Sequence, residues 1–469
     1  MGTPHPSGAQ RTVVAIVAGL SAGQIGADTP TLRDLARALG GVHMLQPAYP
    51  AVTCTSQATM LTGLSPQGHG IVGNGWLDRE LGEARLWRQS RGLIQAPLVW
   101  ESARVRFPQL SVANLFGWFN MFSSADFTVT PRPQYAADGR KAADILATPD
   151  GLRERLVAEL GAFPLFNFWG PRADIRSTEW IVQATKRVMA WHDPALTICY
   201  LPHLDYVLQR EGPGGPNVRR ELREVDRVMQ SLVAACHARG ARLIICSEYG
   251  IEKARQVIHP NRALRQAGLL SVRQEFGGLN LDLNGSAAFA LCDHQVAHVY
   301  VRHPEAVARS REVLAALPGV QRVLTGSERA EPQLDHARAG DLVLVPEAGA
   351  WFAYPWWTAG SEAPDYARTV DIHRKPGYDP CELLLDAGPL ATSAKVGWFM
   401  LRRRLGMRAL LKCTPLDASL VRGTHGRVDL EPELEPVLLA EGAFLPQEGR
   451  LPMHAVHEVI LRHLTGEPA

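Results

Sequence analysis

Cysteine is scarce in this chain and does not fall into pairs. Seven of the 469 residues are cysteines, an odd number spread from Cys54 to Cys413. They form no CxxC pair and no His/Cys spacing of the kind that holds structural zinc. Disulfides are typical of oxidising compartments, and several of these cysteines lie in apolar, strand-like runs such as LIICS. The sequence therefore predicts reduced thiols and a cytoplasmic protein.

Long hydrophobic runs, internal repeats and a marked charge excess are also absent. No run reaches the roughly 18 apolar residues that a membrane-spanning helix needs, so no membrane span is predicted. The apolar run near the start of the chain is too short for the core of a signal peptide. The formal net charge is +2, which gives no electrostatic reason to expect nucleic acid or an acidic membrane as a partner.

Apolar runs typical of buried strands alternate with a helical pattern. Residues 12–17 (TVVAIV), 195–201 and 242–246 are continuous and apolar, as in parallel strands covered on both faces. Residues 30–39 and 217–238 have helical spacing. Strand, helix and strand recur, so we expect an α/β protein with a mostly parallel sheet. Ligand chemistry then belongs at the C-terminal ends of the strands.

The densest cluster of functional signals lies in residues 49–76, which read YPAVTCTSQATMLTGLSPQGHGIVGNGW. Thr53 and Thr55 stand where a loop becomes a helix, and a helix N-terminus offers free N–H groups to an anion. Asn74 can donate a hydrogen bond to a phosphate oxygen. The alternative is an ordinary helix with a threonine near its cap, which is common.

This segment resembles the nucleophile segment of the alkaline phosphatase superfamily, in the branch of nucleotide pyrophosphatases/phosphodiesterases and phosphonoacetate hydrolases. The resemblance implies that Thr53 is the nucleophile and Asn74 the oxyanion-binding residue, with Thr55 as a second candidate. It also implies an alkaline-phosphatase-like core, a mostly parallel sheet flanked by helices, with a small inserted α+β cap.

Cap and core segments are expected to alternate along the chain. A strand, helix and strand after residue 269 resemble the cap of this branch, and residues 340–343 resemble the return strand of the core. The expected division is core at 11–118, cap or insert loops at 119–175, core at 176–268, a βαβ-like cap at 269–339, and core at 340–469 with an inserted loop at 351–421.

The metal-binding motifs of the family are only partly present. Members of the superfamily hold two metals through Asp, His and the nucleophile, and the resemblance assigns Asp205 and His425 to such positions. Gln209 stands where the family has His, and Glu248 where it has Asp. Gln can offer only a neutral carbonyl oxygen.

Two further positions have lost their ligands. Ala18 follows the first strand where the family has Asp, and an alanine cannot ligate a metal. Tyr249 replaces His, and a phenol with a pKa of about 10 is a poor zinc ligand at neutral pH. We therefore expect one divalent ion, held by Asp205 and His425 with Gln209 and Glu248 as further candidates. Zinc, manganese and magnesium all stay open.

Other polar residues are secondary candidates. His203 precedes Asp205 by two positions and could serve as a substitute ligand or base. Asp371 and His373 would face one side of an extended segment, and Arg374 and Lys375 could hold a phosphate. A solvated loop with local salt bridges explains the last four residues equally well.

The favoured function is a metal-assisted phosphoester or phosphodiester hydrolase that acts on a small phosphorylated metabolite through a phospho-threonine intermediate. A phosphoryl-group transferase, in which an alcohol replaces water in the second step, is one alternative. A binding protein that retained the fold and lost catalysis is another, and Ala18 is the residue that most favours it.

Overall fold

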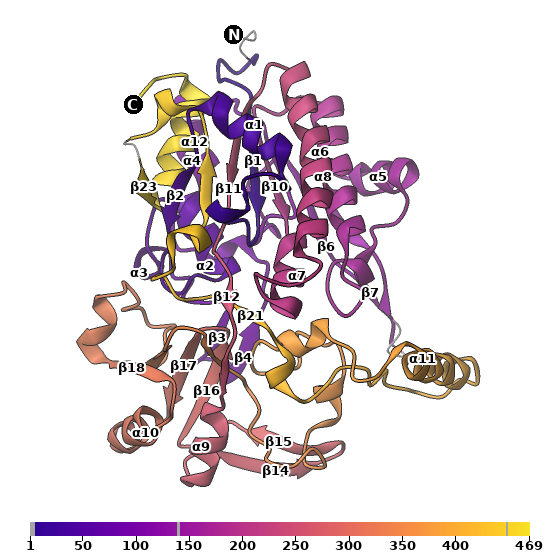
Figure 1. Ribbon diagram of the computed structural model, residues 1–469, viewed down its shortest axis with the longest axis vertical. Coiled ribbons are helices and arrows are strands. Elements are labelled where there is room, and N and C mark those ends of the chain that lie inside the picture. The colour runs from indigo at the N-terminus through magenta and orange to yellow at the C-terminus, as the bar shows by residue number, and fades with distance from the viewer. Residues whose placement is uncertain (1–4, 138–140, 447–448) are drawn as a thin grey trace.

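The computed structural model describes residues 5–137, 141–446 and 449–469, and its centre is a nine-stranded sheet (Figure 1). β1 pairs in parallel with β10 and β11, as do β10 with β5 and β5 with β6. The antiparallel pairs involve β22 and β9. The strands, in sheet order, are β23 (Arg450–Pro452), β2 (His43–Gln46), β22 (Val437–Leu439), β11 (Arg242–Cys246), β1 (Thr12–Val17), β10 (Leu196–Leu201), β5 (Val112–Leu115), β6 (Phe127–Pro131) and β9 (Ile145–Thr148).

Helices cover both faces of this sheet, which explains its continuous apolar strands. Every residue of β1 and β10 is buried, as expected where both faces are covered. α1, α6 and α8 pack together on one face, and α12 packs with α2 and α4 on the other (Figure 1). The helices are α1 (Pro30–Leu39), α2 (Thr53–Thr62), α3 (Pro66–His69), α4 (Val99–Arg106), α5 (Leu152–Leu160), α6 (Ile175–His192), α7 (His203–Glu211), α8 (Val218–Ala238), α9 (Pro260–Gln266), α10 (Glu305–Ala315), α11 (Pro389–Arg404) and α12 (Ala455–Thr465). The predicted α/β class is confirmed.

A second, antiparallel sheet lies below the C-terminal edge of the first (Figure 1). Its order is β16 (Ala288–Asp293), β17 (Val296–Val301), β19 (Leu342–Pro346) and β18 (Val320–Thr325), and α9 and α10 pack against it. The expectation that the segment from residue 340 returns to the core sheet is wrong, because β19 runs between β17 and β18. A buried-strand pattern specifies burial, not sheet membership. The division into core and cap segments stays a prediction.

Short two-stranded ribbons contain the remaining strands of the described residues. They are β3 (Gly75–Asp78) with β4 (Glu83–Leu86), β7 (Gln134–Tyr135) with β8 (Lys141–Ala142), β12 (Glu252–Lys253) with β21 (Gly423–Thr424), β13 (Gln256–Ile258) with β20 (Ala350–Phe352), and β14 (Ser271–Glu275) with β15 (Gly278–Asp282). β21 runs so close to α7 that a Cβ on Gly423 would overlap the Leu208 carbonyl oxygen. This close approach, which only glycine permits, places the residues after β21 beside α7.

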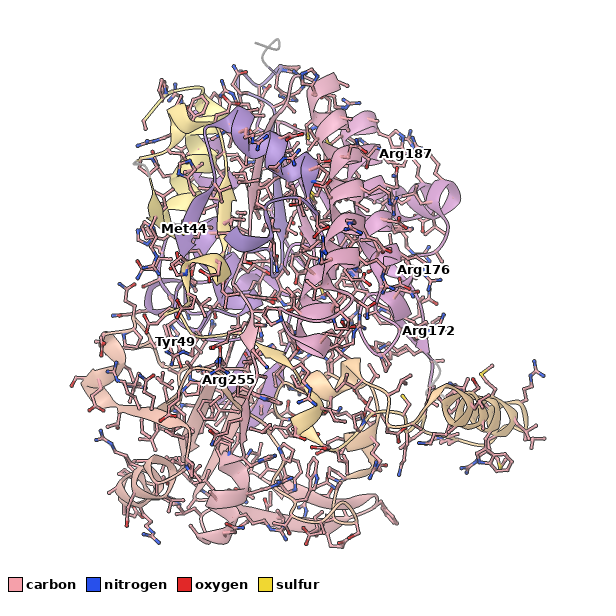
Figure 2. All side chains as sticks on the ribbon, in the orientation of Figure 1. Met44, Tyr49, Arg172, Arg176, Arg187 and Arg255 are labelled. Atoms are coloured by element: carbon pink, nitrogen blue, oxygen red, sulfur yellow. The ribbon has the colours of Figure 1, made fainter. Side chains whose placement is uncertain are left out.

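Tyr49 ties the loop before α2 to the second sheet. Its hydroxyl donates to the carbonyl oxygens of Gln295 and Leu344, at 3.3 and 3.2 Å. Figure 2 labels Tyr49 and Arg255 at the level between the two sheets, whereas Arg176 and Arg187 lie along the outer surface of the helical side. The segment that carries Thr53 is therefore anchored to both sheets.

Two sequence expectations concern cysteines and membrane spans. All seven cysteines are free and buried. No helix among the described residues combines the length and apolarity needed to cross a bilayer.

Candidate functional site

Thr53 stands at the first position of α2, directly after the N-cap residue Val52. The β2 strand that leads into this loop runs parallel to the central strands, since both β2 and β11 are antiparallel to β22. Thr53 therefore lies at the C-terminal edge of the sheet. Its side chain is only 5% exposed, and the helix N-terminus beside it favours an anion.

A chain of hydrogen bonds runs from Thr53 across the site. Thr53 Oγ1 lies 3.3 Å from the hydroxyl of Tyr249, which donates to Asp205 Oδ1 at 3.3 Å. Gln209 Nε2 donates to Asp205 Oδ2 at 2.7 Å, and the Tyr378 hydroxyl donates to Gln209 Oε1 at 2.8 Å. Asp205 follows β10 and Tyr249 follows β11, so parallel strands bring both residues to one edge.

His425 presents a free nitrogen to this network. Its Nδ1 donates to the Ala51 carbonyl oxygen at 2.8 Å, which leaves Nε2 as the unprotonated nitrogen, 3.8 Å from Asp205 Oδ1. The ring stacks on Tyr249 at a centroid distance of 3.6 Å and meets the tilted ring of His294 at 3.7 Å. Burial lowers the pKa of His425 to about 3, so the ring is neutral and able to act as a ligand.

Two buried carboxyl groups carry raised pKa values. Burial raises the pKa of Asp205 to about 6. Burial, together with the nearby Asp205, raises the pKa of Glu248 well above its usual range. Glu248 Oε1 accepts from Gln57 Nε2 at 2.7 Å, whereas buried Oε2 has no hydrogen-bond partner among the described residues. An unpartnered buried carboxyl oxygen beside a second carboxyl group is a natural place for a cation.

Asn74 braces the start of α2. Its Oδ1 accepts from the Cys54 backbone N–H at 2.9 Å, and its Nδ2 donates to Asp293 Oδ1 at 3.1 Å. Asp293 Oδ2 also accepts from the Asn74 backbone N–H at 2.9 Å. The Asn74 amide nitrogen carries two hydrogens, so one remains to donate to a ligand. Asn74 thus lies beside the N-terminus of α2, which begins at Thr53.

The structure brings together Thr53, Asp205, Glu248 and His425, which are far apart in the sequence. Thr55, the second nucleophile candidate, is fully buried, and its hydroxyl donates to the Ile71 carbonyl oxygen at 3.1 Å. Thr55 therefore has a structural hydrogen bond instead of a place beside Tyr249.

The described residues around Thr53 offer donor types that suit a divalent ion, but their ligand atoms are not gathered as closely as those of His203, Glu221 and Glu224, which lie within 4.8 Å of one another. Neutral His425 Nε2, the Asp205 carboxyl group and the unpartnered oxygen of Glu248 supply the donor types that such an ion binds. Ala18 offers no donor, and burial raises the pKa of Tyr249 well above its usual range, so its phenol stays neutral. The Tyr249 hydroxyl instead bridges Thr53 and Asp205.

Gln209 does not present its carbonyl oxygen to Asp205 in this arrangement. Its amide nitrogen faces the carboxyl group, and its oxygen accepts from Tyr378. Gln209 therefore holds Asp205 in place, and its role as a ligand stays a prediction.

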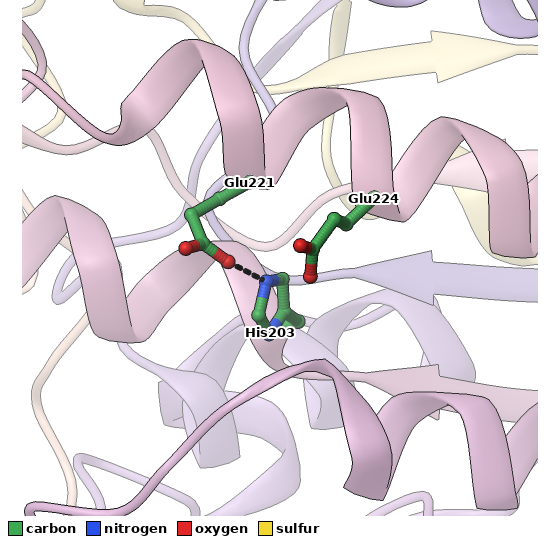
Figure 3. Close-up of side chains that lie close together, drawn as sticks. All are labelled: His203, Glu221 and Glu224. Atoms are coloured by element: carbon green, nitrogen blue, oxygen red, sulfur yellow. Dashed lines mark hydrogen bonds and ion pairs between the residues drawn. The ribbon is translucent and has the colours of Figure 1, made fainter.

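His203 points away from this network toward α8. Its Nε2 lies 2.7 Å from Glu221 Oε2, and Figure 3 shows Glu224 beside the pair. Ligand atoms of His203, Glu221 and Glu224 lie within 4.8 Å of one another, so this trio is a group of described residues whose spacing could hold a metal. The hydrogen bond from His203, followed by one from Arg220, lowers the pKa of Glu221 to about 2.

Residues 371–375 form a turn, so the expected extended segment is wrong. The Arg374 backbone N–H donates to the Asp371 carbonyl oxygen at 3.3 Å, and the Arg374 side chain is exposed and paired with Asp371. His373 is also exposed. Lys375 is buried, and its Nζ lies 2.7 Å from Asp379 and 2.8 Å from Glu382. These two ion pairs occupy the lysine that was expected to hold a phosphate.

Several residues of the site were not predicted from the sequence. Tyr378 orients Gln209, and His294 stacks on Tyr378 and contacts His425 with tilted rings. Asp293 orients Asn74. The sequence offered one indication of these residues. The segments Asp293–Gln295 (DHQ) and Gly377–Pro380 (GYDP) are dense in polar residues that the family motifs leave unexplained. Their contacts require coordinates.

Comparison with known proteins gives a family match along most of the chain. A model of the type I phosphodiesterase / nucleotide pyrophosphatase family matches residues 12–379. An uncharacterized pyrophosphatase/phosphodiesterase of Schizosaccharomyces pombe is 24% identical over 234 residues, or 48% of this chain. That match spans only 41% of the relative's length.

Two kinds of solved structure share the fold at low identity. Murine ectonucleotide pyrophosphatase / phosphodiesterase 5 aligns with a TM-score of 0.59 and 15% identity, over 98% of this chain and 96% of that chain. Phosphonoacetate hydrolase from Sinorhizobium meliloti 1021, in complex with phosphonoformate, aligns with a TM-score of 0.61 and 15% identity, over 96% and 95% of the two chains. An inactive form of the murine protein was solved in complex with AMP. These similarities place the core among alkaline-phosphatase-like folds.

Proposed function

Because this chain belongs to the type I phosphodiesterase / nucleotide pyrophosphatase family, a family of hydrolases that act on phosphoric ester bonds, we propose that it hydrolyses a phosphoester or phosphodiester through Thr53. The observation that carries this proposal is the placement of Thr53. It opens a helix, beside Asn74, and its hydroxyl contacts Tyr249.

Tyr249 and Asp205 give the proton of Thr53 a path away from the reacting oxygen. As Thr53 Oγ1 bonds to phosphorus, its proton moves to the phenol oxygen, and the phenol proton moves to Asp205 Oδ1. The bond to the leaving oxygen breaks, and that oxygen keeps the electron pair. Asp205 serves as the base in the metal-free site, where a pKa of about 6 suits proton transfer near neutral pH. With an ion bound, the Asp205 carboxylate would instead be a ligand, and the Thr53 hydroxyl would lose its proton more readily. Water then hydrolyses the phospho-threonine.

Asn74 and the start of α2 hold the phosphoryl oxygens. The free amide hydrogen of Asn74 and the first backbone N–H groups of the helix are donors of the type that stabilises negative charge developing in the transition state. Asp205, His425 and Glu248 would hold one divalent ion. When bound, such an ion would neutralise phosphoryl oxygens and lower the pKa of the attacking hydroxyl.

The substrate we propose is a small phosphorylated metabolite. Neighbours in the fold bind AMP and phosphonates, which supports an anionic phosphorus group as the shared feature. The free cysteines support a cytoplasmic location.

The test is turnover of a phosphodiester panel by the wild type, Thr53→Ala and Thr55→Ala, with Mg²⁺, Mn²⁺ or Zn²⁺ supplied. Thr53→Ala should abolish turnover, and Thr55→Ala, the matched control, should only weaken it. Mass spectrometry of acid-quenched wild type should find a phosphoryl group on Thr53. Equal turnover by wild type and Thr53→Ala would exclude Thr53 as the nucleophile.

A binding protein on the same fold is the second candidate, and Ala18 and Tyr249 are the residues that favour it. Binding of phosphate esters without turnover in the presence of any of the three metals would identify the chain as such a binding protein. Calorimetric titration with AMP and a phosphonate distinguishes the two.

A further inference from the structure

α11 stands apart from the rest of the molecule, held by the loops at its two ends (Figure 1). None of its described side chains is buried, and no part of it belongs to a hydrophobic cluster of the described residues. Helices in globular proteins owe most of their stability to packing of an apolar face. An isolated, well-formed helix of this length therefore needs a surface that the chain itself does not provide.

One side of this helix carries a row of apolar side chains, and Val396 and Met400 are exposed away from that row. Leu390, Ala394, Trp398, Leu401 and Leu405 follow one another at steps of four, four, three and four, which places them on one side of a helix. Leu390 is 89% exposed, Trp398 is 61% and Leu405 is 66%. Exposed large side chains scattered singly are ordinary, whereas a continuous row of them marks an interaction site.

The same segment is strongly basic. Residues 389–412 contain Lys395, Arg402, Arg403, Arg404, Arg408 and Lys412 and no acidic residue. Since the whole chain carries a net charge of +2, the remainder of the chain is net negative. Lys395 pairs with Asp386, but no described carboxylate pairs with Arg402, Arg404 or Arg408. The positive charge near the end of the helix is thus available to a partner.

We propose that residues 389–412 dock on the surface of an anionic phospholipid bilayer. Leucine and tryptophan on one face with arginines beside them are the features of a helix that lies in the membrane interface. Anionic headgroups attract such a basic segment. Nucleic acid would leave the aliphatic side chains uncovered, and a second copy would bring two basic helices together. The helix is too short and too charged to span the bilayer.

The test is co-sedimentation of the full chain with vesicles of phosphatidylcholine alone or mixed with phosphatidylserine. The wild type should bind the mixed vesicles at low salt, and should bind them less at high salt because salt screens the attraction. Trp398→Ser with Leu401→Ser should lower the bound fraction at least about tenfold, from the loss of two apolar side chains. These changes touch no packed core, so the unfolding temperature and turnover of a soluble phosphodiester should be unchanged.

Matched charge variants separate a local effect from net charge. Replacing Arg402, Arg404 and Arg408 by glutamine should abolish the preference for phosphatidylserine. Replacing Arg219, Arg223 and Arg227 on α8 by glutamine removes the same charge and should preserve it. The proposal is overturned if the wild type ignores mixed vesicles at low salt, or if both sets behave alike. It is also overturned if Trp398→Ser with Leu401→Ser abolishes self-association or capture of a protein partner and leaves vesicle binding intact.

Discussion

The rings of Tyr249 and His425 lie flat against each other, with centroids 3.6 Å apart and planes inclined by 1°. This stacking fixes the direction of the Tyr249 hydroxyl, which reaches both Thr53 and Asp205. The side chain at the position where the resemblance expects a metal ligand is thus held against Thr53, the proposed nucleophile.

Tyr249→Phe should keep the stacked ring and remove the hydroxyl. We expect turnover to fall roughly 10²-fold, the lower range for loss of a proton-transfer group, with little change in the unfolding temperature. Tyr206→Phe, another buried tyrosine near the site, is the control and should retain most activity. Steady-state kinetics decide, and a Tyr249→Phe enzyme as fast as wild type would remove the phenol from the mechanism.

Asn74→Ala should cost roughly 10²-fold or more in kcat, the scale of losing one oxyanion donor. Asp293→Ala removes the brace on the far side of Asn74 but leaves its amide group in place. If Asn74 only braces the helix, Asp293→Ala should be as slow as Asn74→Ala. If the amide binds a phosphoryl oxygen, Asn74→Ala should be clearly slower than Asp293→Ala.

Wild-type protein should hold at most one divalent ion per chain at the Thr53 site, because Ala18 and Tyr249 supply no anionic donor. The double variant Ala18→Asp, Tyr249→His should bind one ion more than wild type. Elemental analysis of dialysed protein measures the metal content of the wild type and of the double variant. The His203→Ala change, made in each, removes any metal bound by the trio in Figure 3. Two equivalents in the His203→Ala protein would contradict the assignment.

Lys375→Met should destabilise the protein by about 3–5 kcal/mol, because it leaves two carboxyl groups in a buried site without their partner. Lys395→Met removes an exposed pair with Asp386 and should cost about 0–1 kcal/mol. Denaturant unfolding of both variants gives the comparison. Equal, small losses would mean that Lys375 is not needed to compensate Asp379 and Glu382.

The sequence predicted the regular parts of the fold well. Thr12–Val17, Pro30–Leu39 and Arg242–Cys246 have the predicted bounds, because continuous β-branched runs and a capped helical pattern are local signals. β19 was assigned to the wrong sheet, since pairing depends on residues far away in the sequence. The turn at 371–375 was missed because Lys375 is drawn inward by Asp379 and Glu382, and such a buried ion pair has no sequence pattern.

The sequence predicted that Thr53, Asp205 and His425 lie near one another, but not the contacts among them, and their catalytic and metal-binding roles stay predictions. The order of the motifs identified Thr53, Asp205 and His425. The orientation of His203 could not be predicted in this way, because it depends on Glu221 of α8, which is distant in the sequence. The hydrogen bonds of Tyr249 to Thr53 and Asp205 also could not be predicted, because the sequence shows only that a tyrosine stands where the family has histidine. The basic helix α11 was overlooked because whole-chain charge averages a positive segment against a negative remainder.

The two anchors on either side of Thr53 limit how substrate can enter. Tyr49 bonds to backbone oxygens of the second sheet, and Asn74 bonds to Asp293 at the end of β16. A hinge motion that separated the two sheets would pull both anchors and displace Thr53. The loop around Tyr378 is held as well, because the Tyr378 backbone N–H donates to the Cys292 carbonyl oxygen at 2.8 Å and its ring stacks on His294. We infer that the two sheets stay fixed relative to each other during turnover.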